Sequence, residues 1–202
     1  MCIPVVYRVT VGQLQENCYL LWKEGREDAV VVDPGAEGDK ICDALLLNKK
    51  KPVAVLLTHG HFDHTGALMR FQELPIYMSP EDNFMLNDPA MNVGGCFGDT
   101  APRPAATNPV ADGDRFTLAG IEFTVMGTPG HTKGCVCYFA DDQFILTGDT
   151  LFKHAYGRVD HPGGDYPALV NSLKKLLRLK KDYPIYPGHG EASTIFTEKM
   201  GL

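Results

Sequence analysis

The segment "LLTHGHFDHTGA" (56–67) contains three histidines and one aspartate within six positions, directly after an apolar run. These four residues are His59, His61, Asp63 and His64. Imidazole nitrogens and carboxylate oxygens are the ligands that zinc and related divalent metals take from proteins. A polar surface loop would also explain this segment by itself, so the choice depends on the rest of the chain.

Three later segments repeat the same arrangement, in which an apolar run ends at a ligand-type residue within a turn rich in glycine, proline and threonine. "FTVMGTPGHT" contains His131, "FILTGDT" contains Asp149, and "YPIYPGHG" contains His189. Each of these residues alone would be an ordinary turn residue. Together with the first cluster, they indicate that four strands deliver five histidines and two aspartates to one place.

Seven such groups suit two metal ions. A catalytic zinc needs three protein ligands and an open position for water, and two ions about 3.5–4 Å apart can share a carboxylate. We expect one ion at His59, His61, His131 and Asp149, and a second at Asp63, His64, His189 and Asp149. We expect zinc in both positions, with iron and manganese as alternatives. His154 and His161 belong to no such motif and are expected to be ordinary histidines.

Predicted strands and helices alternate in the first half of the chain, and predicted hairpins follow in the second half. Apolar, β-branched runs predict strands at residues 4–9, 18–22, 29–33, 52–58, 74–79, 121–127, 135–140, 143–149 and 183–189. Apolar residues at three- and four-residue spacing predict helices at residues 37–50, 64–74 and 165–181. Asp165 is the expected N-cap of the last helix. This pattern favours an α/β fold with two packed sheets and helices outside, in a single domain over residues 1–202.

The composition limits the possible partners. The net charge of -6 argues against nucleic acid, because neutralising phosphates requires a basic face. No stretch approaches the roughly 18 apolar residues of a membrane span, and the start of the chain lacks the pattern of a secretion signal. We therefore expect a cytoplasmic protein with a small-molecule substrate and no membrane or nucleic-acid partner. The six cysteines show no CxxC spacing and are expected to be reduced. The oligomeric state stays open.

The segment 86–114 is rich in proline, glycine and asparagine, and it contains no predicted element. Connections of this length without secondary structure are usually functional or disordered. We expect a loop that borders the site.

The motifs "THGHFDHTGA", "TPGHTKGC", "TGDTLF" and "PGHG", in this order, resemble those of the metallo-β-lactamase superfamily. "VVDPGA" (31–36) resembles the opening motif of that superfamily, in which Asp33 would brace the loop that carries the histidines. The resemblance covers nearly the whole chain. It implies a four-layer αββα sandwich with two metals at one edge of the sheets.

Within the superfamily, "GDTLFKHAYGRVDHPGGD" (148–165) resembles the short bacterial type of the glyoxalase II branch, the hydroxyacylglutathione hydrolases. Asp149 stands where the best-known zinc β-lactamases place a cysteine. The resemblance implies thioester hydrolysis by a metal-bridging hydroxide. Asp63 and Asp149 would be metal ligands first, with acid–base catalysis as a secondary role. Arg158 and Asp160 match this motif, either as a brace of the loop or as substrate contacts.

Two departures from full-length glyoxalase II leave the thiol carrier open. The chain stops about a dozen residues after His189, and the lysine and tyrosine stretch that helps to hold glutathione is not recognisable. One alternative is a persulfide dioxygenase with a single iron held by His59, His131 and Asp149. Another is a metallo-hydrolase of a different ester, a lactone or a β-lactam. A nuclease is less compatible with the negative net charge. A non-catalytic metal-binding protein is less compatible with the complete set of seven ligand-type residues.

Overall fold

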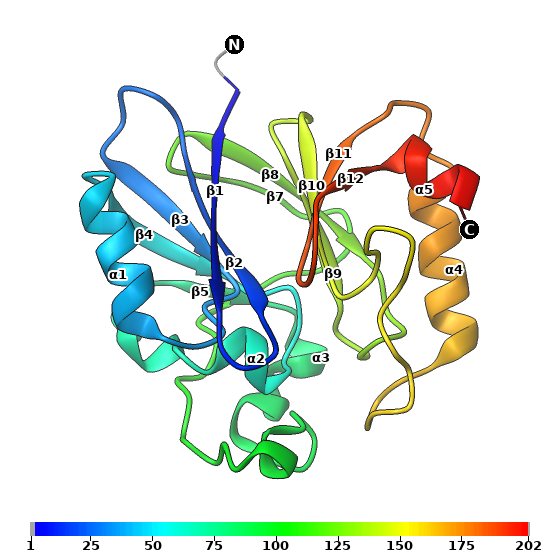
Figure 1. Cartoon of the computed structure of the whole chain (residues 1–202), viewed down its shortest axis with the longest axis horizontal. Helices are drawn as coiled ribbons and strands as arrows, with labels where there is room; N and C mark the ends of the chain where they lie inside the picture. The colour runs from blue at the N-terminus through cyan, green and yellow to red at the C-terminus, as the bar shows by residue number, and fades with distance from the viewer. Residues whose placement is uncertain (1–2, 202) are drawn as a thin grey trace.

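The computed structural model describes residues 3–201 and contains two six-stranded sheets that pack face to face (Figure 1). The first sheet consists, in spatial order, of β1 (Val5–Val11), β2 (Glu16–Trp22), β3 (Asp28–Val32), β4 (Lys51–Leu56), β5 (Ile76–Met78) and β6 (Asn108–Pro109). The second sheet consists of β12 (Ser193–Thr194), β11 (Pro184–Pro187), β10 (Phe144–Gly148), β9 (Val136–Ala140), β8 (Ile121–Gly127) and β7 (Arg115–Leu118).

Helices cover the outer face of each sheet. Helix α1 (Gly38–Leu47) lies against the first sheet, whereas α4 (Tyr166–Leu177) and α5 (Ile195–Gly201) lie against the second (Figure 1). The short helices α2 (Phe62–Thr65) and α3 (Pro80–Asn83) lie near the edge shared by the two sheets. The layers therefore follow the order αββα, and the predicted fold is confirmed.

Three apolar layers fill the spaces between these four layers. Because side chains alternate along a strand, Leu20 of β2 packs toward α1, whereas Leu21 packs toward the second sheet. Phe123 and Tyr138 fill the space between the sheets, and Leu169 of α4 is fully buried against the second sheet. Both sheets are covered on both faces, which explains the long apolar runs in the sequence.

The predicted helix at 64–74 is wrong over most of its length. Helix α2 ends at Thr65, and a 3₁₀ turn follows at Leu68–Phe71. At Gly66 the chain presses against the loop after β3, because a Cβ atom added at Gly66 would lie 2.3 Å from the Gly35 carbonyl oxygen. The Ala67 amide donates to the Pro34 carbonyl instead of continuing the helix. A contact between distant segments thus overrides the helical spacing.

The predicted long loop at 86–114 contains more structure than the sequence suggested. It begins within a 3₁₀ turn at Phe84–Asn87, contains another at Gly94–Phe97, and includes β6, which pairs in parallel with β5. The final β12 and α5 were also absent from the predictions. No helix in the described part of the chain combines the length and the hydropathy of a membrane span.

Replacing Asp165 with alanine tests the cap of α4. Its Oδ1 accepts a hydrogen bond from the Ala168 amide at 2.9 Å, as an N-cap requires. We expect Asp165→Ala to lower the free energy of unfolding by about 1 kcal/mol in urea denaturation. Asp39→Ala is the control, because Asp39 contacts Arg70 only through an exposed ion pair, and it should cost less than about 0.5 kcal/mol. Equal losses in both variants would contradict the capping role.

Candidate metal centre

The topology brings the ends of five strands to one edge of the sandwich. Strands β3 and β4 are parallel neighbours, so Asp33 and His59, which follow them, lie at the same edge. Strands β10 and β11 are also parallel, and Asp149 and His189 follow them. Because β8 and β10 are both antiparallel to β9, β8 also points to this edge and delivers His131.

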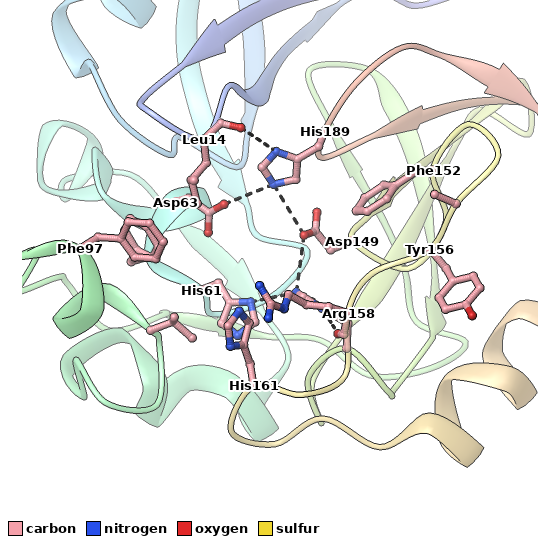
Figure 2. A pocket seen from close by; sticks show the side chains of 14 residues that line it. Leu14, His61, Asp63, Phe97, Asp149, Phe152, Tyr156, Arg158, His161 and His189 are labelled. Atoms are coloured by element: carbon pink, nitrogen blue, oxygen red, sulfur yellow. Dashed lines mark hydrogen bonds and ion pairs between the residues drawn. The ribbon is translucent and has the colours of Figure 1, made fainter.

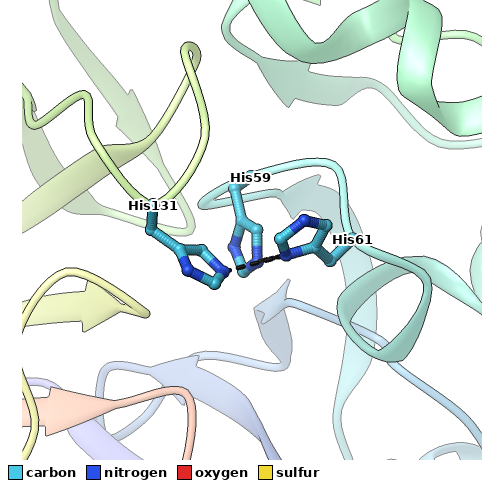
Figure 3. A group of neighbouring side chains, drawn as sticks. All are labelled: His59, His61 and His131. Carbon is cyan, nitrogen blue, oxygen red and sulfur yellow. Dashed lines mark hydrogen bonds between the residues drawn. The ribbon is translucent and has the colours of Figure 1, made fainter. Parts of the chain in front are cut away.

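Three histidine rings form a buried first group (Figure 3). His61 Nδ1 lies 3.1 Å from His59 Nε2 and 2.8 Å from His131 Nε2. Asp149 adds a carboxylate oxygen, since its Oδ2 lies 3.5 Å from His131 Nε2. All four side chains are buried. The ligand atoms of the three histidines form one group, and Asp149 approaches it through His131, in agreement with the first predicted set.

Asp63, His64 and His189 form the second group, which Asp149 also joins. Asp63 Oδ2 lies 3.2 Å from His189 Nε2 and 3.8 Å from His64 Nε2. Asp149 Oδ1 lies 3.3 Å from His64 Nε2. Asp149 Oδ2 lies 3.6 Å from His189 Nε2 (Figure 2). The structure therefore brings all seven predicted residues together, with the Asp149 carboxylate between the two groups.

Hydrogen bonds at the opposite ring nitrogens orient the histidines. His131 Nδ1 donates to the Arg158 carbonyl oxygen at 2.7 Å, and His189 Nδ1 donates to the Leu14 carbonyl oxygen at 3.1 Å. A carbonyl oxygen only accepts, so Nδ1 carries the proton and Nε2 presents its lone pair to the centre. Such partners of metal-binding histidines set both the tautomer and the ring orientation.

Asp33 orients the loop that follows β4, as the resemblance implied. Its carboxylate accepts hydrogen bonds from the Thr58 amide at 2.8 Å and the Thr58 hydroxyl at 2.7 Å. Asp33 Oδ2 also lies 3.1 Å from His64 Nδ1, and the Thr58 hydroxyl lies 3.1 Å from His59 Nδ1. One buried carboxylate thereby fixes a histidine of each group.

The electrostatics of the centre favour a cation. Burial lowers the pKa of His59, and burial together with the neighbouring His131 lowers the pKa of His61 to about 3, so both imidazoles are neutral at pH 7. Burial would raise the pKa of Asp149, but the surrounding histidines outweigh it and hold that pKa well below its usual value. His64 Nε2 and Asp149 Oδ1 are buried without a satisfying hydrogen bond. Burial would lower the pKa of His64, but Asp149 and other neighbouring carboxylates outweigh burial and raise that pKa. The neutral imidazoles of His59 and His61, the ionised Asp149 carboxylate and the unsatisfied ligand atoms fit divalent metal ions.

Asp82, which the sequence analysis missed, connects the two loops that carry the first group. It is fully buried, and its Oδ2 accepts from the Gly60 amide at 3.1 Å and from the Thr132 hydroxyl at 2.5 Å. Its Oδ1 accepts from the Gly134 amide at 2.7 Å. Burial raises the pKa of Asp82, and these hydrogen bonds offset part of the shift. No local pattern around "SPEDN" indicated this contact.

Glu16 is a second missed residue. Its side chain is 1% exposed, neither carboxylate oxygen has a hydrogen-bond partner, and Oε1 lies 3.7 Å from His64 Nδ1. Burial raises the pKa of Glu16 well above its ordinary value. The only sequence signal was a charged residue two positions before the apolar run "CYLLW".

A cavity of about 480 Å³ opens over both groups (Figure 2). Val93 and Phe97 line it, so the prediction that segment 86–114 borders the site is confirmed. His161, which was expected to be an ordinary histidine because no motif surrounds it, also lines the cavity, with its ring 5.8 Å from that of His61. His154 is exposed and lies outside the cavity, 3.6 Å from the buried Glu198.

The chain matches the Metallo-beta-lactamase superfamily over residues 11–189. It belongs to this superfamily. Members of the superfamily are metal-dependent hydrolases that bind divalent metals.

The hydroxyacylglutathione hydrolase GloC of Haemophilus influenzae is 35% identical over 203 residues, covering 95% of this chain and 93% of that protein. The probable metallo-hydrolase YqgX of Bacillus subtilis is 32% identical, with coverage of 95% and 93%.

Solved structures of this superfamily superpose on nearly the whole chain. The BLEG-1 B3 metallo-beta-lactamase has a TM-score of 0.91 and 31% identity, and the match covers 96% of both chains. TTHA1623 in a di-iron-bound form has a TM-score of 0.83 and 38% identity, with coverage of 95% and 96%. A similar protein thus holds two irons, so the likeness does not single out zinc for this chain.

Replacing Asp82 with asparagine tests the connection between the two loops. Whichever way the amide turns, its NH₂ group faces a backbone N–H of Gly60 or Gly134 and leaves it unpaired. We expect Asp82→Asn to lower the free energy of unfolding by about 1–3 kcal/mol in chemical denaturation and to weaken metal binding in titrations.

Asp88→Asn is the matched control, because the Asp88 carboxylate also accepts two backbone N–H groups but lies in a partly exposed turn. Asp88→Asn should lower the free energy of unfolding by less than Asp82→Asn does, and it should leave metal binding unchanged. Unchanged metal binding in the Asp82 variant would show that this carboxylate does not support the centre.

Proposed function

We propose that this protein is a dinuclear metal-dependent hydrolase whose substrates are thioesters. The observation that carries the proposal is the position of Asp149. Its two carboxylate oxygens lie 3.3–3.6 Å from ring nitrogens of His64, His131 and His189, which belong to different ligand groups. A carboxylate shared in this way is characteristic of centres that hold two metal ions.

The seven side chains divide into two ligand sets. His59, His61 and His131 would hold one ion, Asp63, His64 and His189 would hold the second, and Asp149 would serve both. We expect zinc, with iron or manganese as alternatives. When bound, such ions lower the pKa of a water molecule toward neutrality and polarise a substrate carbonyl.

The residues of the chain set the direction of attack. Asp63 and His189 are partly exposed and line the cavity, whereas His59 and His64 are completely buried beneath it. A substrate carbonyl therefore approaches from the cavity side. The Asp63 and Asp149 carboxylates lie on that side and can accept a proton from the attacking water in addition to their role as ligands. Asp33 and the Leu14 and Arg158 carbonyls keep the rings in place during the reaction.

The leaving group favours a thioester. A thiol has a pKa of about 8.5, so a thiolate departs with little help from an acid. The nitrogen of an amide needs a proton as it leaves. The similarity to a hydroxyacylglutathione hydrolase and the motif around Arg158 and Asp160 also support a thioester.

β-Lactam hydrolysis is the second candidate. It is supported by the 31% identity and the TM-score of 0.91 to a B3 metallo-beta-lactamase.

A substrate panel distinguishes these reactions. Protein stripped with a chelator and reloaded with zinc, iron(II) or manganese is tested on two thioesters, S-lactoylglutathione and S-lactoyl-N-acetylcysteamine, and on a β-lactam and a lactone. We expect the stripped protein to be inactive and the reloaded protein to prefer the thioester. Preference for the β-lactam or the lactone would overturn the assignment. Oxygen uptake with a persulfide by protein that holds one iron would favour the dioxygenase alternative.

Replacing His59 with alanine removes a ligand of the first group from a fully buried position. We expect kcat/KM to fall on the order of 10³-fold or more, with a lower metal content and a retained circular dichroism spectrum. The control is His154→Asn, since His154 lies outside the cavity and has φ 59°, which asparagine tolerates. The control should stay within about twofold of the wild type. Full activity of His59→Ala would contradict a metal mechanism at this centre.

A further inference from the structure

The walls of the cavity differ sharply from its floor. Ligand-type side chains form the floor, whereas large apolar side chains form the rim (Figure 2). Leu14 comes from the turn between β1 and β2, Phe97 from segment 86–114, and Phe152 and Tyr156 from the segment after β10. Three separate parts of the chain thus contribute apolar groups to the same opening.

These apolar groups remain accessible to solvent. Leu14 is 39% exposed, Phe97 is 43% exposed and Tyr156 is 40% exposed. Phe97 stacks on Phe62 with ring centroids 4.7 Å apart and planes at 23°, so its exposed face is held toward the opening. Apolar surface that gathers around a cavity marks a binding site for an apolar ligand group.

The charge at the opening is neutralised within the protein. Arg158 is the one lysine or arginine side chain among the described residues that line the cavity. Its Nε and Nη2 atoms donate to Asp160 Oδ1 and Oδ2 at 2.6 and 2.5 Å, respectively. This two-point pair occupies the Nε–Nη2 edge of the guanidinium, which is one of the two edges that can bind a carboxylate, and places a compensating negative charge beside it. The opening therefore offers no uncompensated positive side chain to an anionic carrier such as glutathione.

We infer that the cavity takes thioesters whose acyl and thiol groups are apolar and uncharged, and that the Arg158–Asp160 pair disfavours anionic thiol carriers. This inference rests on the proposed thioester hydrolysis and specifies its substrate class. Asp160 acts as a specificity-determining residue because it cancels the charge of the one arginine at the opening. The apolar rim contributes affinity in proportion to the apolar area that the substrate buries.

A comparison of thiol carriers tests the substrate class with the metal-loaded wild-type protein. S-lactoyl-N-acetylcysteamine, which is uncharged, is compared with S-lactoylglutathione, and acetyl, butyryl and hexanoyl thioesters of N-acetylcysteamine are compared with one another. We expect kcat/KM to be at least about tenfold higher for the uncharged carrier and to rise roughly fourfold with each methylene that becomes buried.

Equal or better hydrolysis of the glutathione thioester, or no dependence on acyl length, would overturn the inference while leaving thioester hydrolysis intact. Hydrolysis of neither carrier would overturn the proposed function itself.

Two substitutions of the ion pair should move specificity in opposite directions. Asp160→Asn removes the compensating charge, so the KM for S-lactoylglutathione should fall about tenfold relative to that for the uncharged thioester. Arg158→Gln leaves the negative charge of Asp160 unpaired, so the KM for S-lactoylglutathione should rise relative to that for the uncharged thioester. Asp28→Asn is the control, because Arg26 and Asp28 form an equivalent pair two residues apart at the start of β3, far along the strand from the site. A shift in the same direction in both pocket variants would indicate a structural effect and overturn the specificity role.

Replacing Phe97 with alanine tests the apolar rim. Phe97→Ala should reduce the preference for hexanoyl over acetyl thioesters by roughly tenfold. Phe196→Ala is the matched control, since Phe196 is similarly exposed at 40% but belongs to α5 and does not line the cavity. An unchanged acyl preference in Phe97→Ala would overturn the role of the rim.

Discussion

The shared direction of the strands that carry the ligands is the constraint on which this protein depends. Strands β3 and β4 run parallel in one sheet, and β10 and β11 run parallel in the other. Their carboxyl ends meet at one edge, where the sheets face each other. Ligand-type residues that are 130 positions apart, from His59 to His189, can therefore converge. The apolar layers between the sheets hold this edge in place, and the site inherits their rigidity.

Burying so many polar groups is unfavourable unless each has a partner. Asp33 and Asp82 supply partners to the loops that carry the histidines, and backbone carbonyls supply partners to the outer ring nitrogens. Close packing of the backbone completes the arrangement. A Cβ atom added to Gly188 would lie 2.3 Å from Asp149 Oδ1 and 2.5 Å from His64 Cε1, so only glycine lets the chain after β11 approach both groups. His64 Nε2 and Asp149 Oδ1, which face the centre, remain unsatisfied, which suits a cation.

The two parts of the site have different structural origins. The floor comes from residues directly after core strands, where the backbone has little freedom. The rim comes from the β1–β2 turn and the longer segments after β5 and β10, which the core constrains less. The proposed chemistry and the proposed selection of the substrate therefore belong to different parts of the chain.

The sequence by itself determined the places of the main strands and the seven ligand-type residues, and it indicated two packed sheets with helices outside. Each of these depends on local information: apolar runs, turn residues, and histidines or aspartates at strand ends. The four-layer αββα order was implied by the resemblance of the motifs to the superfamily. Only the tertiary structure decided that the helix expected at 64–74 stops at Thr65, that Asp82 and Glu16 lie beside the centre, and that His161 reaches the cavity. These features depend on contacts between segments far apart in the chain. No local pattern records which atoms of such segments approach one another, because packing alone sets those distances.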